Sequence, residues 1–229
     1  MSNIPLVVIT GASSGIGAAT AELFSKAGFC LALLARNKQA MESLDLKDAL
    51  CIETDVTDLG QVKSAISKAE THFGPVDCLI NNAGFAQGGA FGSLTHEAHE
   101  RTIQVNVMGV LNSIEAVLPG MQERHQGTII NISSVADRSC RPNIATYAAS
   151  KAAVKSLTES LRSANAKYGI RFCNVAPAKI KTPLMMKAQL SEDQVIQPEQ
   201  MAETLLWVYQ QPHSICIRDL VIAPTAYEP

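Results

Sequence analysis

Three side chains that can handle protons or bind oxygen stand in the second half of the sequence. Tyr147 and Lys151 are four residues apart in a segment with helical spacing, so a helix would place both on one face. An ammonium beside a phenol favours the phenolate and lowers a pKa that starts near ~10. Such a tyrosine can act as a general acid and base, and Ser134 at the end of a predicted strand can hydrogen-bond a substrate oxygen beside it. Taken alone, the pair can also be an ordinary surface pair.

A second candidate site lies near the start of the sequence. The apolar run Leu6–Ile9 leads into Thr10-Gly11-Ala12-Ser13-Ser14-Gly15-Ile16-Gly17, and an apolar helical segment follows. A strand, a tight turn and a helix N-terminus in this order offer backbone N–H groups to an anion. We therefore predict a pyrophosphate cradle at the start of a βαβ unit. The glycine spacing departs from the commoner G-x-G-x-x-G, and a turn without a ligand is the alternative.

Arg36 directly follows the second predicted strand and lies 19 residues beyond Gly17. At this place an acidic residue binds the adenosine ribose 2′-hydroxyl, or an arginine receives a 2′-phosphate. No Asp or Glu stands at this strand end, and a planar guanidinium suits phosphate. The sequence thus favours NADP(H) over NAD(H), with Ser13 and Ser14 as further hydroxyl donors to the phosphate. The alternative is a solvated surface arginine.

The elements that must position these residues alternate between strand and helix. Strands are expected at 6–9, 29–35, 50–54, 76–80, 128–132, 170–175 and 220–223. Helices are expected at 18–27, 37–47, 61–73, 95–124, 145–168 and 198–210, with Pro119-Gly120 kinking or interrupting the longest. Apolar strands in this alternation predict an α/β, three-layer, doubly wound Rossmann fold with a central, mostly parallel seven-stranded sheet. We expect one domain over residues 1–229.

In such a sheet, ligands bind outside the carboxyl ends of the strands. The residues just past the predicted strands are nearly all polar or glycine: Thr10–Gly17, Arg36, Asp55–Val56, Asn81–Gly84, Ser134 and Pro177–Thr182. Asn106 stands among apolar residues within the longest helical pattern, where asparagine is mildly disfavoured, so a functional or buried-water role is expected. We expect these segments to form one site.

Composition excludes several classes of function. With 229 residues, 47% of them hydrophobic, the chain can bury a sizeable core. A net charge of −2 without charged runs favours neither nucleic acid nor a membrane surface, and no apolar segment has the length of a membrane span. We expect a cytoplasmic protein without a metal. The scattered cysteines predict buried free thiols at Cys30, Cys51, Cys78 and Cys173.

In combination, these segments resemble the short-chain dehydrogenase/reductase family. The resemblance rests on Thr10–Gly17, Asn81-Asn82-Ala83-Gly84, Ser134 and Tyr147-Ala148-Ala149-Ser150-Lys151, and it runs from the first strand to the last. It implies hydride transfer between NADP(H) and a carbonyl or secondary alcohol, with no metal in the chemistry (EC 1.1.1.-). A non-enzymatic NADP(H)-binding redox sensor on the same fold is the alternative. The full set of catalytic residue types favours the enzyme.

The resemblance also implies roles for individual residues. Tyr147 would exchange a proton with the substrate oxygen, Lys151 would hold the nicotinamide ribose, and Ser134 would orient the substrate. Asn106 would hold a water that links Lys151 to solvent. The implied cofactor contacts are Gly11, Ser13, Ser14, Gly15, Ile16, Gly17, Arg36, Asp55, Val56, Asn82, Ala83, Gly84, Tyr147, Lys151, Pro177, Ile180 and Thr182.

Some positions depart from the family pattern. Ala178 and Asp137 stand where the family commonly has glycine, and the implied substrate lid, about 183–197, is short. Within this family, the sequence as a whole most resembles the NADP-dependent subgroup that acts on small hydroxy acids. Arg138 and Arg141 can anchor a substrate carboxylate, or they face solvent or a subunit interface. We expect a homodimer or homotetramer.

Overall fold

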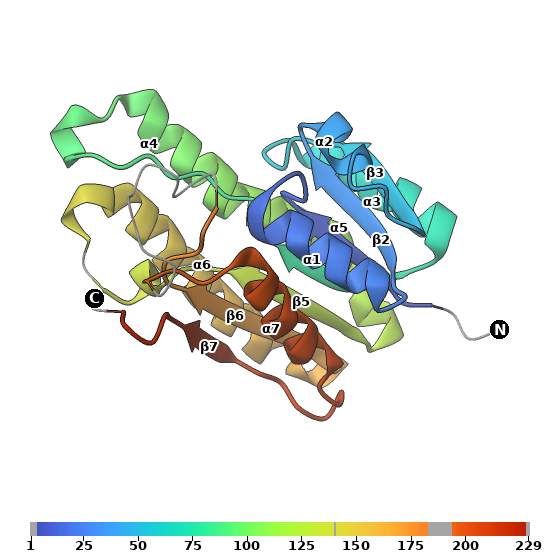
Figure 1. The fold of residues 1–229 in the computed structure, drawn as a ribbon. Coiled ribbons are helices and arrows are strands. Elements are labelled where there is room, and N and C mark those ends of the chain that lie inside the picture. The colour runs from blue at the N-terminus through green and yellow to red at the C-terminus, as the bar shows by residue number, and fades with distance from the viewer. Residues whose placement is uncertain (1–3, 140, 183–193, 228–229) are drawn as a thin grey trace.

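The computed structural model describes residues 4–139, 141–182 and 194–227. One sheet runs through the molecule in the order β3-β2-β1-β4-β5-β6-β7 (Figure 1). Its strands are β1 (Leu6–Thr10), β2 (Cys30–Ala35), β3 (Ala49–Glu53), β4 (Val76–Asn81), β5 (Gly127–Ile132), β6 (Ile170–Pro177) and β7 (Asp219–Ile222). Every pair of neighbours is parallel, so the predicted doubly wound fold is confirmed and the sheet is parallel throughout.

The helices form a layer on each side of this sheet. They are α1 (Gly15–Lys26), α2 (Lys38–Glu42), α3 (Leu59–Phe73), α4 (His96–Ile103), α5 (Gly109–Arg124), α6 (Ala145–Asn165) and α7 (Pro198–Gln210). Helices α1 and α7 lie together over one face, and α3, α5 and α6 cover the other (Figure 1). Two apolar cores result, one on each side of the sheet.

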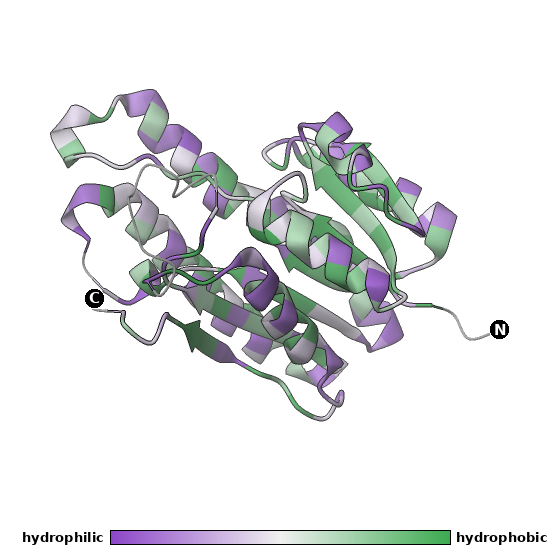
Figure 2. Cartoon of the chain, viewed as in Figure 1, coloured by the Kyte–Doolittle hydropathy of each residue, from purple (hydrophilic) through white to green (hydrophobic). Residues whose placement is uncertain are grey.

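The strands carry apolar side chains on both faces because both faces are covered. Strands β1, β2, β5 and β6 are buried along their whole length. Figure 2 shows β1 and β2 as largely apolar, whereas α1 and α7 alternate between hydrophilic and hydrophobic residues. Near-continuous apolar runs and amphipathic helices therefore account for the three layers.

Two helical predictions need correction. The polar stretch 37–47 forms only the short helix α2, because Met41 is its one buried side chain and a longer helix would have little to pack. The segment 95–124 divides into α4, a π-helical turn at Gln104–Met108, and α5. The irregularity therefore lies around Asn106, and α5 continues through Pro119.

The cysteine prediction is confirmed for Cys30, Cys78 and Cys173, which are free and buried, whereas Cys51 is free and half-buried. Residues 183–193 of the predicted lid lie outside the described part of the chain. Among the described residues, no helix combines the length and the apolar character that crossing a membrane requires.

Candidate functional site

The carboxyl ends of the strands surround one cavity of about 1550 Å³. It brings together most of the predicted site residues, as expected for an open α/β sheet. These are Gly11, Ser13, Ser14, Gly15, Ile16, Arg36, Asp55, Val56, Asn82, Ala83, Gly84, Ser134, Arg141, Tyr147, Lys151, Pro177, Ile180 and Thr182. Gly17, Asn106 and Arg138 are the predicted site residues that do not line it.

The glycine-rich turn needs its glycines for two different reasons. Gly11 and Gly15 have φ values of +67° and +56°, in the left-handed region that glycine adopts without strain. Gly17 has no such angle, but a Cβ there would lie 2.4 Å from the carbonyl oxygen of Gly11. Gly17 is therefore required for close packing beneath the turn, and its predicted contact with the cofactor stays a prediction.

Thr10 and Asn82 fasten this turn to the end of β4. The Thr10 hydroxyl accepts hydrogen bonds from the backbone N–H groups of Asn82 and Ala83 at 3.0 and 3.1 Å. The Asn82 amide donates in return to the carbonyl oxygens of Thr10 and Gly11 at 3.0 and 3.1 Å. Thr10 belongs to the predicted site segment Thr10–Gly17, but its role in fastening the turn to β4 was not predicted.

Helix α1 begins at the cavity and offers an anion-binding end. Its N-cap residue, Ser14, makes no side-chain capping bond, so its hydroxyl is available to a ligand, and Ser13 lies beside it. Unpaired backbone N–H groups and the helix dipole favour negative charge at this end. The turn thus fits a dinucleotide pyrophosphate.

Arg36 follows β2 at the same rim of the cavity and is exposed. No carboxylate in the described part of the chain forms an ion pair with it. A neighbouring polar residue, Asn37, is occupied in capping α2 through a 3.0 Å bond from the backbone N–H of Ala40. The guanidinium of Arg36 is accordingly free to bind a phosphate.

The loop after β3 is held by α5. The Val56 carbonyl oxygen accepts a 2.9 Å hydrogen bond from the Asn112 amide. A Cβ on Gly109 would lie 2.7 Å from Val56 Cγ2, so a glycine is needed where α5 approaches this loop. Asp55 accepts hydrogen bonds from the backbone N–H and the hydroxyl of Thr57. These contacts fix Asp55 and Val56 at the cavity wall.

Helix α6 carries Tyr147 and Lys151 into the cavity. Lys151 is 5% exposed, and its Nζ donates a 2.8 Å hydrogen bond to the carbonyl oxygen of Ile132. The ammonium nitrogen lies 5.7 Å from the centroid of the Tyr147 ring. Burial lowers the pKa of Lys151 to about 8, and the negative charge of Asp137 opposes that shift. Lys151 can therefore change its charge within the physiological range.

The pKa of Tyr147 differs from the sequence expectation. Burial raises it, a hydrogen bond with Ser134 lowers it, and the charge of Asp137 raises it further, so that the net shift is upward. We had expected Lys151 to lower this pKa, but the ammonium is directed at the Ile132 carbonyl. The phenol is thus protonated at neutral pH and can donate a proton.

Ser134 reaches the cavity at the end of β5. Its backbone is extended, and its Oγ accepts a 3.2 Å hydrogen bond from the N–H of Ala136, which caps a short 3₁₀ turn at Val135–Asp137. This turn follows the strand and lies against α6. Ser134 and Tyr147 therefore face the same part of the cavity from two different elements.

Asn106 lies behind the cavity wall and is fully buried. Its Oδ1 accepts a 2.7 Å bond from the N–H of Phe85, and its Nδ2 donates to the Phe85 carbonyl and to Ser150 Oγ at 2.9 and 3.0 Å. All of these partners are protein groups. Its side chain therefore links the segment after β4 to α6, and no direct contact joins it to Lys151.

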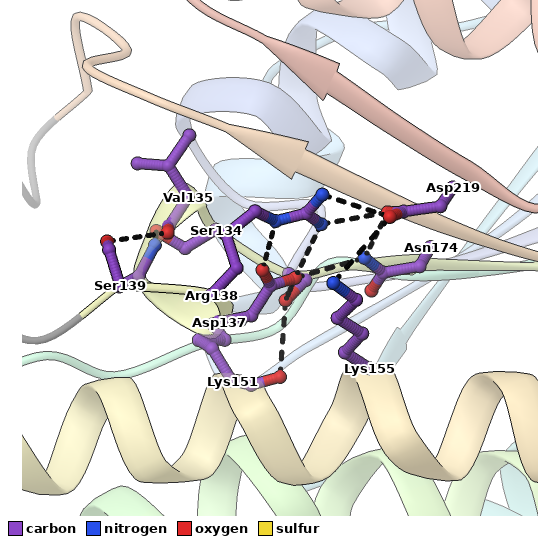
Figure 3. A network of polar contacts seen from close by, with 11 residues as sticks. Ser134, Val135, Asp137, Arg138, Ser139, Lys151, Lys155, Asn174 and Asp219 are labelled. Carbon is purple, nitrogen blue, oxygen red and sulfur yellow. Dashed lines mark hydrogen bonds and ion pairs between the residues drawn. The ribbon is translucent and has the colours of Figure 1, made fainter. Parts of the chain in front are cut away.

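Arg138 and Arg141 have different surroundings. Arg138 lies between the carboxylates of Asp137 and Asp219, with nitrogen–oxygen distances of 2.5 to 3.1 Å (Figure 3). Its hydrogen bonds to these groups raise its pKa above the ordinary value. Arg138 is thus held by two carboxylates away from the cavity wall, and a substrate contact for it stays an untested prediction.

Arg141, in contrast, lines the cavity and donates to the hydroxyl of Tyr227 from the C-terminal segment. Lys179 also lines the cavity, and its Nζ lies 5.7 Å from the centroid of the Tyr227 ring. Sequence reasoning missed Tyr227 and gave Lys179, which lies in the predicted segment Pro177–Thr182, no role of its own. No sequence pattern connects either residue with Arg141.

Comparisons with known proteins match this geometry. A family model described as short chain dehydrogenase matches residues 5–193. An uncharacterised oxidoreductase of Staphylococcus saprophyticus is 34% identical over 227 residues, which cover 96% of this chain and 97% of the relative.

Two solved structures bear different cofactors. A 3-ketoacyl-(acyl-carrier-protein) reductase from Brucella melitensis complexed with NADH is 28% identical, with a TM-score of 0.91 and coverage of 96% of this chain and 97% of that one. A serine dehydrogenase in its closed form complexed with NADP⁺ is 25% identical, with a TM-score of 0.92 and coverage of 98% and 96%.

Proposed function

Since the chain belongs to the short chain dehydrogenase family of oxidoreductases, we propose that it transfers a hydride between NADP(H) and a carbonyl or secondary alcohol. The observation that carries the proposal is the convergence of Ser134, Tyr147 and Lys151 on the cavity that also receives the glycine-rich turn. The nearby helix N-terminus suits a pyrophosphate.

The residues of this chain divide the work of the proposed reaction. A bound nicotinamide would supply the hydride chemistry in the reductive direction. Tyr147 donates its phenolic proton to the carbonyl oxygen, which becomes the alcohol. Ser134 donates a hydrogen bond to the same oxygen and stabilises its developing negative charge. Lys151 would hold the nicotinamide ribose hydroxyls when the cofactor is bound.

We assign the preference for NADP(H) over NAD(H) to Arg36. Its guanidinium is exposed at the cavity rim and has no carboxylate partner among the described residues, so a 2′-phosphate can bind there. Ser13 and Ser14 would add donors. The comparison structures carry NADH in one case and NADP⁺ in another, so the preference has to be measured for this chain.

Arg36→Asp tests this assignment, because a carboxylate repels a 2′-phosphate and accepts hydrogen bonds from a ribose 2′-hydroxyl. We expect the ratio of kcat/KM for NADPH to that for NADH to fall by at least about 100-fold, which corresponds to about 3 kcal/mol. Lys38→Asp makes the same charge change two residues away and serves as the control. An unaltered ratio in Arg36→Asp would remove Arg36 from the phosphate site.

We further propose that the substrate bears an acidic group that Arg141 binds. Arg141 and Lys179 bring two cations to the cavity, and neither forms an ion pair with a carboxylate in the described ranges. A guanidinium binds a carboxylate with two parallel hydrogen bonds. Small hydroxy acids and the corresponding oxo acids are the first compounds to test.

The experiment for the reaction class is a screen of NADP⁺ reduction with small alcohols and hydroxy acids, and of NADPH oxidation with the matching carbonyl compounds. Turnover of any pair supports the proposal. Tight NADPH binding without turnover of any compound would instead favour a redox sensor. Three further statements stay predictions: a cytoplasmic location, one domain over residues 1–229, and assembly into a homodimer or homotetramer. Gel filtration with light scattering would measure the number of chains in the assembly.

A further inference from the structure

A buried carboxylate lies directly behind the catalytic serine. The side chain of Asp137 is fully buried, although it belongs to the short turn that follows β5. Isolated charges are not stable in such a place, and a carboxylate there needs partners for all of its lone pairs. Its surroundings supply them from several elements (Figure 3).

The partners of Asp137 connect the catalytic turn to its neighbours. Oδ2 accepts from Ser133 Oγ at 2.8 Å, from Asn174 Nδ2 at 3.0 Å and from Arg138 Nη2 at 3.1 Å. The Ser133 hydroxyl is also 3.3 Å from the backbone carbonyl oxygen of Lys151 on α6. The backbone N–H of Asp137 donates to the carbonyl oxygen of Ser134 at 2.9 Å. One side chain therefore holds the serine-bearing turn against the helix that bears Tyr147 and Lys151.

The same carboxylate is tied to the edge of the sheet. Arg138 bridges Asp137 to Asp219 at the start of β7, and Asn174 of β6 donates to both carboxylates. Lys155 of α6 approaches Asp219 at 3.7 Å. Removing the Asp219 carboxylate would take one partner from Arg138 and one from Asn174, and it would leave the hydrogen bonds of Asp137 itself in place.

We propose that Asp137 is a positioning residue for the proposed reaction: its buried carboxylate fixes the turn that carries Ser134 and, through Ser133, sets that turn against the backbone of Lys151. The proposal rests on the proposed function. It assigns a role to a position where this chain departs from the glycine that the family commonly has. Asp137 itself touches neither cofactor nor substrate, because it does not line the cavity.

The negative charge of Asp137 has a measurable effect on neighbouring pKa values, which a residue that acted by packing alone would not have. The charged and titratable groups around it are Arg138 on the same turn, Asp219 of β7, and Tyr147, Lys151 and Lys155 on α6. Its negative charge raises the pKa of both Tyr147 and Lys151. Replacing it by a neutral group of the same shape should therefore lower both values.

The test compares Asp137→Asn with Asp219→Asn, a matched control that makes the same change on the other side of Arg138. For Asp137→Asn we expect kcat of carbonyl reduction to fall by about 10- to 100-fold, because small displacements of catalytic groups slow a reaction by factors of this size. The affinity for NADPH should stay within about twofold of wild type. The alkaline limb of kcat/KM for NADPH should move to lower pH. Asp219→Asn should lower thermal stability, change kcat less than about threefold and leave that limb in place. Equal kcat losses in both variants, or an unmoved limb in Asp137→Asn, would overturn the proposal.

Two further measurements keep the test decisive. Ser133→Ala removes the link to Lys151 without leaving a buried charge unpaired, so it should fold and should lower kcat in the same direction by a smaller factor. Ultraviolet titration of the tyrosines, with Tyr147→Phe as the blank, reports the Tyr147 pKa without any turnover. A lower Tyr147 pKa in Asp137→Asn is expected even if no carbonyl compound is reduced, which separates failure of this proposal from failure of the proposed function.

Discussion

Arg138 and Arg141 lie in the same loop between β5 and α6, yet they have opposite tasks. The Arg138 side chain lies between two carboxylates and is 27% exposed, so its positive charge is neutralised by groups of the protein itself. Arg141 meets the neutral hydroxyl of Tyr227 and faces the cavity. The residue type is the same in both cases, and the elements that fold next to it decide between structure and recognition.

The difference has a simple electrostatic cause. A fully buried carboxylate such as Asp137 requires a compensating cation, and Arg138 is the residue adjacent to it in sequence. A phenol compensates no charge, so the positive charge of Arg141 remains available to an anion in the cavity.

The largest effect is expected on stability. Arg138→Met leaves the Asp137 carboxylate buried without its cation, and we expect the free energy of unfolding to fall by about 3 kcal/mol. Arg141→Met, measured in the same urea titration, should change it by less than about 1 kcal/mol because it removes one hydrogen bond to a hydroxyl and leaves no buried charge unpaired. Similar losses of unfolding free energy in the two variants would show that Arg138 and Arg141 contribute alike to stability.

A smaller effect is expected on substrate binding. Arg141→Ala should raise KM by about 10- to 100-fold for substrates that carry a carboxylate, since a hydrogen bond to a charged group contributes about 1.5–3 kcal/mol. The KM of neutral ketones should stay nearly constant. Equal changes in KM for acidic and neutral substrates would argue against Arg141 as an anchor. If Arg138→Met also raised KM for acidic substrates alone, Arg138 would share the role that is assigned to Arg141.

The third effect concerns pH. Lys151 needs its positive charge to hold the ribose hydroxyls in the proposed reaction, and burial lowers its pKa to about 8. In carbonyl reduction, kcat/KM for NADPH reports the free enzyme and should therefore fall as the pH rises through about 8. Arg141→Ala should keep this limb, because burial and Asp137, and not Arg141, shift the pKa of Lys151. A profile that stays flat to pH 9.5 would contradict the assigned role of Lys151.

The seven strands, the doubly wound fold and the end of the sheet at which the polar segments meet followed closely from the sequence. Apolar runs such as Leu6–Ile9 and Gly127–Ile132 have nowhere to lie except between two layers, and the polar residues after them then meet at one edge. Asn82 and Arg36 reach the cavity for this reason. The local sequence pattern is therefore sufficient to predict the position of residues that the sheet itself brings together.

Local pattern is insufficient where distant contacts decide. Asp219 is 81 residues from Arg138, and Tyr227 is 86 residues from Arg141, so no spacing rule could separate the two arginines. Asn106 also shows this limit. Its helical pattern gave no sign of the π-helical turn or of the Phe85 backbone that satisfies its amide.

The most direct measurement of the central claim is the single-turnover rate of Tyr147→Phe with saturating NADPH and a carbonyl substrate that the wild type reduces. The variant keeps the ring but cannot donate the proton, so the rate should fall by at least about 1000-fold while the affinity for NADPH stays within about threefold. A rate within tenfold of wild type would contradict Tyr147 as the proton donor and, with it, the proposed mechanism.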